Sequence, residues 1–285
     1  MKIRKLKRYC KIFEKYFNNK DYRKALKEHK KIPTCLLSTD GFLYRGVCYA
    51  RLNLLKQAIK TFNQVIIIDN KNVDAYYNRG LAYNNLGISS ANLNLYKQAI
   101  QDFTKVIYLD PNYDRAYANR GNCYINLEEY IKAIADLTKA IELNPNYIEA
   151  YGNRSAAYIK LKEPDKAIND CNKLIRLGEK SGYHNRAIAN ELLERYDNAI
   201  FDFSKAIEFD TKNYYAYWFR GNVFSKIKQY EKAIKDYTKA IELAQQKDAR
   251  TIYRIRGKAY IELGEIEKAN ADFDNVEKII TRNLN

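Results

Sequence analysis

Four asparagines recur at one position of a regularly spaced pattern, and their chemistry suggests a surface that binds peptides. Each stands two residues before a small residue, at Asn78, Asn119, Asn153 and Asn185. A side-chain amide carries both a donor and an acceptor, so a spaced row of amides can hydrogen-bond the main chain of an extended peptide whatever its sequence. The alternative is that asparagine occupies this position for helix packing alone, in a chain rich in asparagine.

Residues around these asparagines on the same helix face would set the specificity of such a surface. They are polar, charged or aromatic, at Tyr77, Arg115, Asn122, Lys160, His184, Trp218, Asn222, Arg254 and Lys258. We interpret His184 as a polar wall residue and not as a ligand or base, because the other histidine is far away in sequence. Trp218, the only tryptophan, is either an anchor for a partner side chain or a cap on neighbouring helices.

An arginine stands directly before the small residue in every copy of the pattern, at Arg45, Arg79, Arg120, Arg154, Arg186, Arg220 and Arg256. Evenly spaced cations could follow a phosphate backbone, as in a nucleic-acid binder. A matching acidic column favours a structural role, since a buried guanidinium needs a carboxylate partner. That column holds Asp102, Asp136, Asp170, Asp202, Asp236 and Asp272, with Thr61 in the first copy. Pairing within one copy leaves Arg45 unpaired, whereas pairing between neighbouring copies sets Arg79 against Thr61; the sequence leaves both open.

The chain holds little material for catalysis or metal binding. It has two histidines and five cysteines, at Cys10, Cys35, Cys48, Cys123 and Cys171, with no CxxC pair, so we expect neither a disulfide framework nor a zinc site. We find no glycine-rich phosphate loop, nucleophile elbow or paired-carboxylate motif. The sequence therefore predicts no enzyme activity, no metal and no cofactor.

The elements that must carry these residues follow from an internal repeat. Its small residue recurs at Gly46, Gly80, Gly121, Ser155, Ala187, Gly221 and Gly257. An aromatic residue stands four positions before it and, except at Asn190, another stands three positions after it, which places both on one stripe of a helix. An alanine follows in the second half of every copy, at Ala58, Ala99, Ala133, Ala167, Ala199, Ala233 and Ala269. Each copy therefore predicts two antiparallel helices joined by a short turn.

One interval of the repeat is longer than the others. Gly80 and Gly121 are 41 residues apart, whereas three of the other intervals are 34 residues long. The extra residues fall in the segment LGISSANLNLY, between the two helices predicted for that copy. We predict a surface loop there, because long insertions are tolerated best in loops; the alternative is a loop that contacts a partner.

The series of small, aromatic, alanine and aromatic residues resembles the tetratricopeptide repeat family over residues 39 to 283. The resemblance implies an all-α fold, a right-handed alpha-alpha superhelix of seven repeats. We place them at 39–72, 73–113, 114–147, 148–179, 180–213, 214–249 and 250–283. Residues 1–38 are predicted to form a degenerate, basic helical hairpin at the N-terminal end, with Ala25 in the alanine column and Phe13 in place of the small residue. In this family the asparagine position lines a concave groove, so the resemblance implies a protein–protein interaction scaffold or adaptor that binds an extended peptide.

Charge and composition indicate one alternative function and argue against a membrane-spanning chain. The 285 residues carry a net charge of +16, and residues 1–38 hold 13 of the basic residues against three acidic ones. The alternative function is therefore a basic solenoid that binds RNA or an anionic surface through its N-terminal hairpin. No apolar run approaches the roughly 18 residues of a transmembrane helix. The opening MKIRKLKRYCKIF lacks the apolar core of a secretory signal, and we expect a cytoplasmic monomer.

Overall fold

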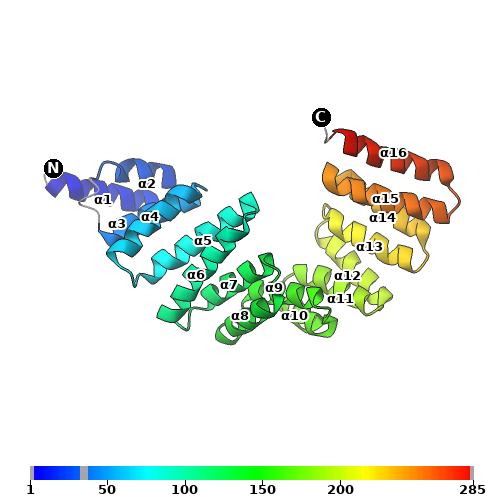
Figure 1. Cartoon of the computed structure of the whole chain (residues 1–285), viewed down its shortest axis with the longest axis horizontal. Coiled ribbons are helices and arrows are strands. Elements are labelled where there is room, and N and C mark those ends of the chain that lie inside the picture. Colours follow the sequence, from blue (N-terminus) through cyan, green and yellow to red (C-terminus); the bar gives the residue numbers. More distant parts are fainter. Residues whose placement is uncertain (1–2, 33–37, 283–285) are drawn as a thin grey trace. The chain divides into compact units, whose positions relative to one another are not determined.

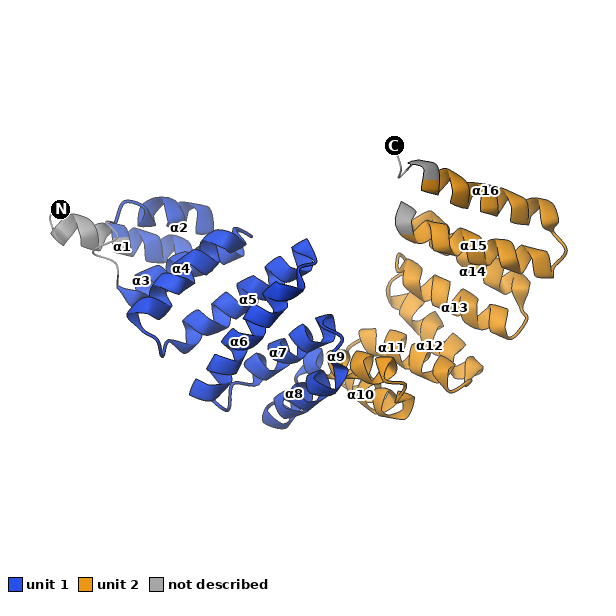
Figure 2. Cartoon of the chain, in the orientation of Figure 1, with its two compact units in different colours: residues 1–150 blue, residues 151–285 orange. Residues whose placement is uncertain are grey.

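The structure is a computed structural model that describes residues 3–32 and 38–282, and these residues form sixteen α-helices and no strand (Figure 1). The helices are α1 (Ile3–Asn18), α2 (Tyr22–His29), α3 (Thr39–Arg51), α4 (Leu55–Ile68), α5 (Val73–Ser90), α6 (Leu93–Leu109), α7 (Asp114–Asn126), α8 (Tyr130–Leu143), α9 (Ile148–Lys160), α10 (Pro164–Arg176), α11 (Ser181–Leu192), α12 (Tyr196–Phe209), α13 (Tyr214–Lys226), α14 (Tyr230–Leu243), α15 (Gln246–Glu262) and α16 (Ile266–Arg282). The chain divides into two compact units, residues 1–150 (unit 1) and residues 151–285 (unit 2) (Figure 2).

Within each unit, consecutive helices pair as antiparallel hairpins that pack on one another. In unit 1, α1 pairs with α2, α3 with α4, α5 with α6 and α7 with α8, and the second helix of each hairpin also contacts the first helix of the next. Unit 2 repeats this scheme with α11 and α12, α13 and α14, and α15 and α16. Stacked hairpins bury a continuous interior that none could bury alone. The predicted all-α solenoid is therefore confirmed.

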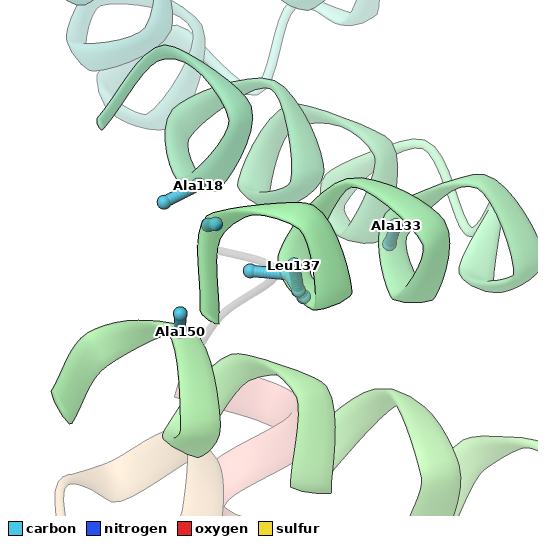
Figure 3. Packing of buried hydrophobic residues seen from close by; sticks show 5 residues of the cluster. Ala118, Ala133, Leu137 and Ala150 are labelled. Carbon is cyan, nitrogen blue, oxygen red and sulfur yellow. The ribbon is translucent and has the colours of Figure 1, made fainter. Parts of the chain in front are cut away.

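The interior is built from small residues set against large ones. Ala118 of α7, Ala133 and Leu137 of α8 and Ala150 at the start of α9 enter one buried cluster, so three successive helices share it (Figure 3). A Cβ atom added at Gly221 of α13 would lie 2.7 Å from the buried ring of Tyr237 on α14. The recurring small residue is therefore required by close approach of the two helices of a hairpin.

The predicted surface loop in the longer copy is wrong, because the extra residues lengthen both helices. Helix α5 has 18 residues and α6 has 17, compared with 13 and 14 in α7 and α8. The two are separated only by Ala91, at a left-handed φ of 49°, and Asn92, whose side chain caps α6. A Cβ atom at Gly87 would lie 3.0 Å from the ring of the buried Tyr96, so the extension has its own close packing. Helix formation satisfies the backbone of the inserted residues, which a loop would leave to water.

Candidate functional site

The first helices of successive hairpins lie side by side and form one surface in each unit, which we call the first-helix face. In unit 1 it comprises α3, α5 and α7, with contacts from α3 to α5 and from α5 to α7. In unit 2 it comprises residues 151–160 of α9, then α11, α13 and α15, with contacts between α11 and α13. Asn185 of α11 reaches α9 by donating from Nδ2 to the Ser155 hydroxyl, at 2.9 Å.

Two of the four predicted asparagines lie on the first-helix face of unit 1. Asn78 is half-buried and donates from Nδ2 to the Asp74 carbonyl, one turn earlier on α5, at 2.8 Å. Asn119 donates from Nδ2 to the Arg115 carbonyl at 2.8 Å and to the Tyr77 hydroxyl at 3.2 Å. Among the described residues, neither Oδ1 atom accepts a hydrogen bond. If asparagine served helix packing alone, its side chain would bond to the chain itself, as both Nδ2 atoms do. Each Oδ1 atom nevertheless remains able to accept a hydrogen bond from a ligand.

The other predicted residues of unit 1 differ in how far they are buried and in what they contact. The ring of Tyr77 packs against Phe103 and Tyr113, with centroids 6.0 and 5.0 Å away, and burial raises the pKa of its hydroxyl. Arg115 is exposed at the start of α7. Asn122 is half-buried and its Oδ1 accepts a bond from Asn126 Nδ2 at 2.9 Å. Tyr77 is thus part core and part surface.

In unit 2 the predicted residues divide between the surface and the interior. Asn153 is half-buried on α9 and Lys160 is exposed at its end. The Oδ1 of Asn222 accepts a 3.0 Å bond from the hydroxyl of the buried Tyr237, so this atom serves the core. Arg254 and Lys258 are exposed on α15.

His184 packs among aromatic rings and not among polar wall residues. Its ring meets those of Phe203 and Phe219 edge-on, with centroids 5.6 and 5.7 Å away. Its Nδ1 atom is buried and has no hydrogen-bond partner among the described residues. Because burial lowers the pKa of His184, the neutral ring is favoured and its role is packing.

Trp218 belongs to a row of stacked rings that the sequence interpretation missed. Its ring stacks on Phe219 at 5.7 Å and on Tyr215 at 6.3 Å, and Tyr215 stacks on Tyr214 at 4.1 Å. Trp218 also packs against the buried cluster of α14 and α15, as the capping alternative expects. The run of aromatic residues in YYAYWF is the signal that could have revealed the row.

The arginine column is structural, and each pair closes within one hairpin. The bidentate pairs join Arg79 to Asp102, Arg120 to Asp136, Arg154 to Asp170, Arg186 to Asp202, Arg220 to Asp236, and Arg256 to Asp272. A third bond reaches back to the preceding hairpin, as from Arg120 Nη1 to the Thr104 hydroxyl at 3.0 Å and from Arg220 Nη1 to the Ser204 hydroxyl at 2.9 Å. The column therefore joins neighbouring hairpins, and its donors are not available to a phosphate backbone.

Arg45 is the member of this column without a carboxylate, as pairing within one copy predicts. Its Nη2 atom donates to Gln64 Oε1 at 2.9 Å, while its Nε atom is buried without a partner among the described residues. Burial lowers the pKa of Arg45. By contrast, the hydrogen bonds from Arg186 to Asp202 raise the pKa of Arg186 above its ordinary value.

The N-terminal hairpin packs on α3 through an aromatic and histidine contact. Phe13 of α1 and the buried Ala25 of α2 share a cluster with Cys48 of α3. The Nε2 atom of His29 donates to the Gly41 carbonyl at 2.8 Å, and its ring meets Phe13 edge-on at 5.1 Å. Five of the thirteen cations invoked for nucleic-acid or anionic-surface binding lie in residues 1–8, whose side chains are outside the described residues.

We expect the free energy of unfolding to fall as the pH drops below about 6.5, the ordinary pKa of histidine. Burial lowers the pKa of both His29 and His184 in the folded chain. The unfolded chain then binds more protons than the folded chain below that pH, so acidification favours unfolding. Urea titrations at about pH 7.5 and pH 5.5 measure the loss in the free energy of unfolding. Both pH values lie above the range in which ordinary carboxylates titrate. The double variant His29→Gln with His184→Phe should flatten this dependence, and an unchanged slope would contradict the assignment.

No helix among the described residues is both long and apolar enough to span a bilayer. The same part of the chain holds no group of three or more histidine, cysteine or acidic residues placed to hold a metal ion.

Models described as tetratricopeptide repeat match residues 81–113, 114–147, 137–169, 181–213 and 215–247, and one described as TPR repeat matches residues 48–87. No curated protein matches the chain. A tetratricopeptide repeat protein from Parabacteroides merdae is 20% identical, with a TM-score of 0.68 over 85% of this chain and 93% of that one. The C-terminal part of a TPR repeat-containing protein from Cytophaga hutchinsonii is 18% identical, with a TM-score of 0.63 over 83% and 95%. YrrB, a TPR protein with an unusual peptide-binding site, is 22% identical, with a TM-score of 0.51 over 64% and 91%.

Proposed function

We propose, from the premise that this chain belongs to the tetratricopeptide repeat family, that it is a protein-interaction scaffold whose first-helix face binds an extended segment of a partner protein. The observation that carries the proposal is the arrangement of Asn78 and Asn119 in unit 1. Their bonds to Asp74 and Arg115 hold both side chains in place, while their Oδ1 atoms keep free lone pairs. Two fixed acceptors on neighbouring helices can receive main-chain N–H groups of an extended peptide, which alternate in direction along the strand.

Unit 2 would contribute contacts of a different kind. The row formed by Tyr214, Tyr215, Trp218 and Phe219 offers ring faces on α13, and Tyr215 is 44% exposed. Aromatic side chains provide contact area at low cost in conformational entropy, so this row would by itself bind apolar side chains of a partner that contacts unit 2. A scaffold, and not an enzyme, is the function that these features support. YrrB, which shares the fold, is described by its peptide-binding site.

Selection of peptides from a displayed library on the purified chain, followed by calorimetry, tests the proposal. For a peptide that contacts unit 1, the double variant Asn78→Ala with Asn119→Ala should bind about tenfold more weakly, because two hydrogen bonds are lost at about 1 kcal/mol each or less. Its melting temperature should stay close to that of the native chain, since neither side chain is fully buried.

The matched control is Asn94→Ala with Asn112→Ala. Both of these asparagines are exposed and lie outside the first helices of unit 1. This control should bind the selected peptide as the native chain does. Equal affinity of the Asn78 and Asn119 double variant and the native chain would contradict the role of these amides. Equal weakening by the control would show a non-specific effect of removing surface amides.

A further inference from the structure

Two neighbouring second helices in unit 1 carry lysines and no carboxylate on their solvent side. We define the outer stripe of a second helix as the residues two before and two, six and nine after its repeat alanine, which share one helix face. The outer stripes of α4 and α6 comprise Lys56, Lys60, Gln64 and Ile67, and Lys97, Gln101, Lys105 and Tyr108. The one acidic residue of these two helices, Asp102, is buried in its pair with Arg79.

The first stripe position is acidic in most of the later second helices. The position of Lys56 is occupied in α10, α12, α14 and α16 by Asp165, Asp197, Glu231 and Glu267. All four lie in the first turn of their helix, where the helix dipole favours a carboxylate and disfavours a cation. Lys56 also lies in the first turn of α4, so the stability of the helix does not explain this lysine.

The last two stripe positions differ in the same direction. In α8, α12 and α14 they form ion pairs at 2.8 to 3.1 Å, Lys139 with Glu142, Lys205 with Glu208, and Lys239 with Glu242. In α6 the glutamate is replaced by Tyr108, which is 77% exposed, and Lys105 Nζ lies 4.9 Å from the centre of its ring. Among the described residues, none of the four stripe lysines of α4 and α6 is in an ion pair. Their charge is therefore available to a ligand.

A hollow lies between the two stripes. Helices α4 and α6 flank Arg79 of α5, which donates a hydrogen bond to a side chain on each of them. The hollow has a volume of about 340 Å³ and is open to solvent, and its walls include Gln98 and Gln101 of α6 and Ile67 of α4. Within the described part of the chain, neither glutamine amide has a hydrogen-bond partner. Hollows of this kind also occur in unit 2, so the charge of the flanking stripes is what distinguishes this one.

We propose that α4 and α6 form a binding surface for single-stranded nucleic acid. The stripe lysines pair with phosphates, the Tyr108 ring stacks on a base, and the amides of Gln98 and Gln101 bond to the edge of a base in the hollow. An acidic protein segment would use the lysines alone, so the exposed ring and the two amides favour a nucleic acid. The surface lies on second helices, and it is therefore separate from the first-helix face and from the N-terminal hairpin.

The test is a fluorescence anisotropy titration of the full chain with a labelled oligothymidylate of about twelve nucleotides, repeated at several salt concentrations. Two further probes carry the same negative charge. One is an abasic oligomer, which has the phosphates without the bases, and the other is an oligoglutamate. We expect each of them to bind at least about tenfold more weakly than the oligothymidylate, because neither can stack on Tyr108.

The double variant Lys60→Gln with Lys97→Gln should bind the oligothymidylate about tenfold more weakly. The slope of log K against log salt should become shallower by about 1.4, since each phosphate contact with a single strand contributes about 0.7. The matched control Lys212→Gln with Lys235→Gln removes the same charge from exposed lysines of unit 2 and should leave the slope unchanged. Tyr108→Ala should weaken binding about tenfold at an unchanged slope, because the ring carries no charge.

Several results would overturn the proposal. One is the absence of saturable binding at low salt. Equal affinity for the abasic oligomer would exclude contacts with bases, as would native affinity in Tyr108→Ala, and equal affinity for the oligoglutamate would assign the surface to an acidic protein segment. An unchanged slope in the Lys60 and Lys97 double variant, or an equal change in its control, would place the phosphate contacts elsewhere. None of these variants touches Asn78 or Asn119, so the outcome is independent of the proposed first-helix site.

Discussion

Replacement of Asp236 by alanine should lower the free energy of unfolding by about 3 kcal/mol, because it leaves the Arg220 guanidinium buried without its carboxylate. Asp236 accepts bonds from Arg220 Nε and Nη2 at 2.7 and 2.8 Å, and the two side chains are 7% and 20% exposed. Arg220 would keep only its bond to the Ser204 hydroxyl of the preceding hairpin. Urea unfolding monitored by circular dichroism measures the loss.

Glu242→Ala on the same helix is the matched control for this experiment. Glu242 pairs with Lys239 at 2.8 Å, but both side chains are about half exposed, and such surface pairs contribute about 0 to 1 kcal/mol. A loss in Asp236→Ala as small as that in Glu242→Ala would contradict a structural role for the arginine column.

Replacement of Phe103 by alanine should cost about 4 kcal/mol through the cavity that it leaves. Phe103 is fully buried on α6, where its ring fills the space beside Gly80 and lies 6.0 Å from the ring of Tyr77. Because Tyr77 accepts the bond from Asn119, the variant should also loosen the first-helix face of unit 1. Calorimetric melting and the amide exchange of α5 measure the two effects.

Tyr108→Ala on the same helix provides the comparison, since Tyr108 is 77% exposed. It should change the free energy of unfolding by about 0.5 kcal/mol or less. If both variants melted alike, the packing columns inferred from the repeat would be misplaced on α6.

The hairpins could be predicted because their cause is local and repeated. The glycine and alanine columns require close helix contacts, and this requirement recurs in every copy with the same spacing. The partner of each arginine could be predicted as an aspartate but not assigned to one hairpin, because helical spacing alone allows both arrangements. The structure resolves it: the carboxylate lies in the same hairpin, while a hydroxyl or amide of the preceding hairpin receives the remaining donor.

The candidate site was harder to predict, because surface and core roles alternate on one helix. His184 and Asn222 occupy positions on the expected stripe, yet the first packs between phenylalanines and the second accepts the Tyr237 hydroxyl. These contacts depend on residues from neighbouring helices, whose placement a single-helix pattern does not specify.

The lengthened hairpin of α5 and α6 shows that the tips of these hairpins can grow while the interior is preserved. Arg79 and Asp102 are 23 residues apart instead of 16, yet they form the same bidentate pair as Arg120 and Asp136. Helices α5 and α6 both lengthen at the end next to the turn, so their packing register against the neighbouring helices is kept. Insertions at the tip of a hairpin can therefore accumulate with little effect on folding. An additional recognition element could be grafted at such a tip while the stacked hairpins stay unchanged.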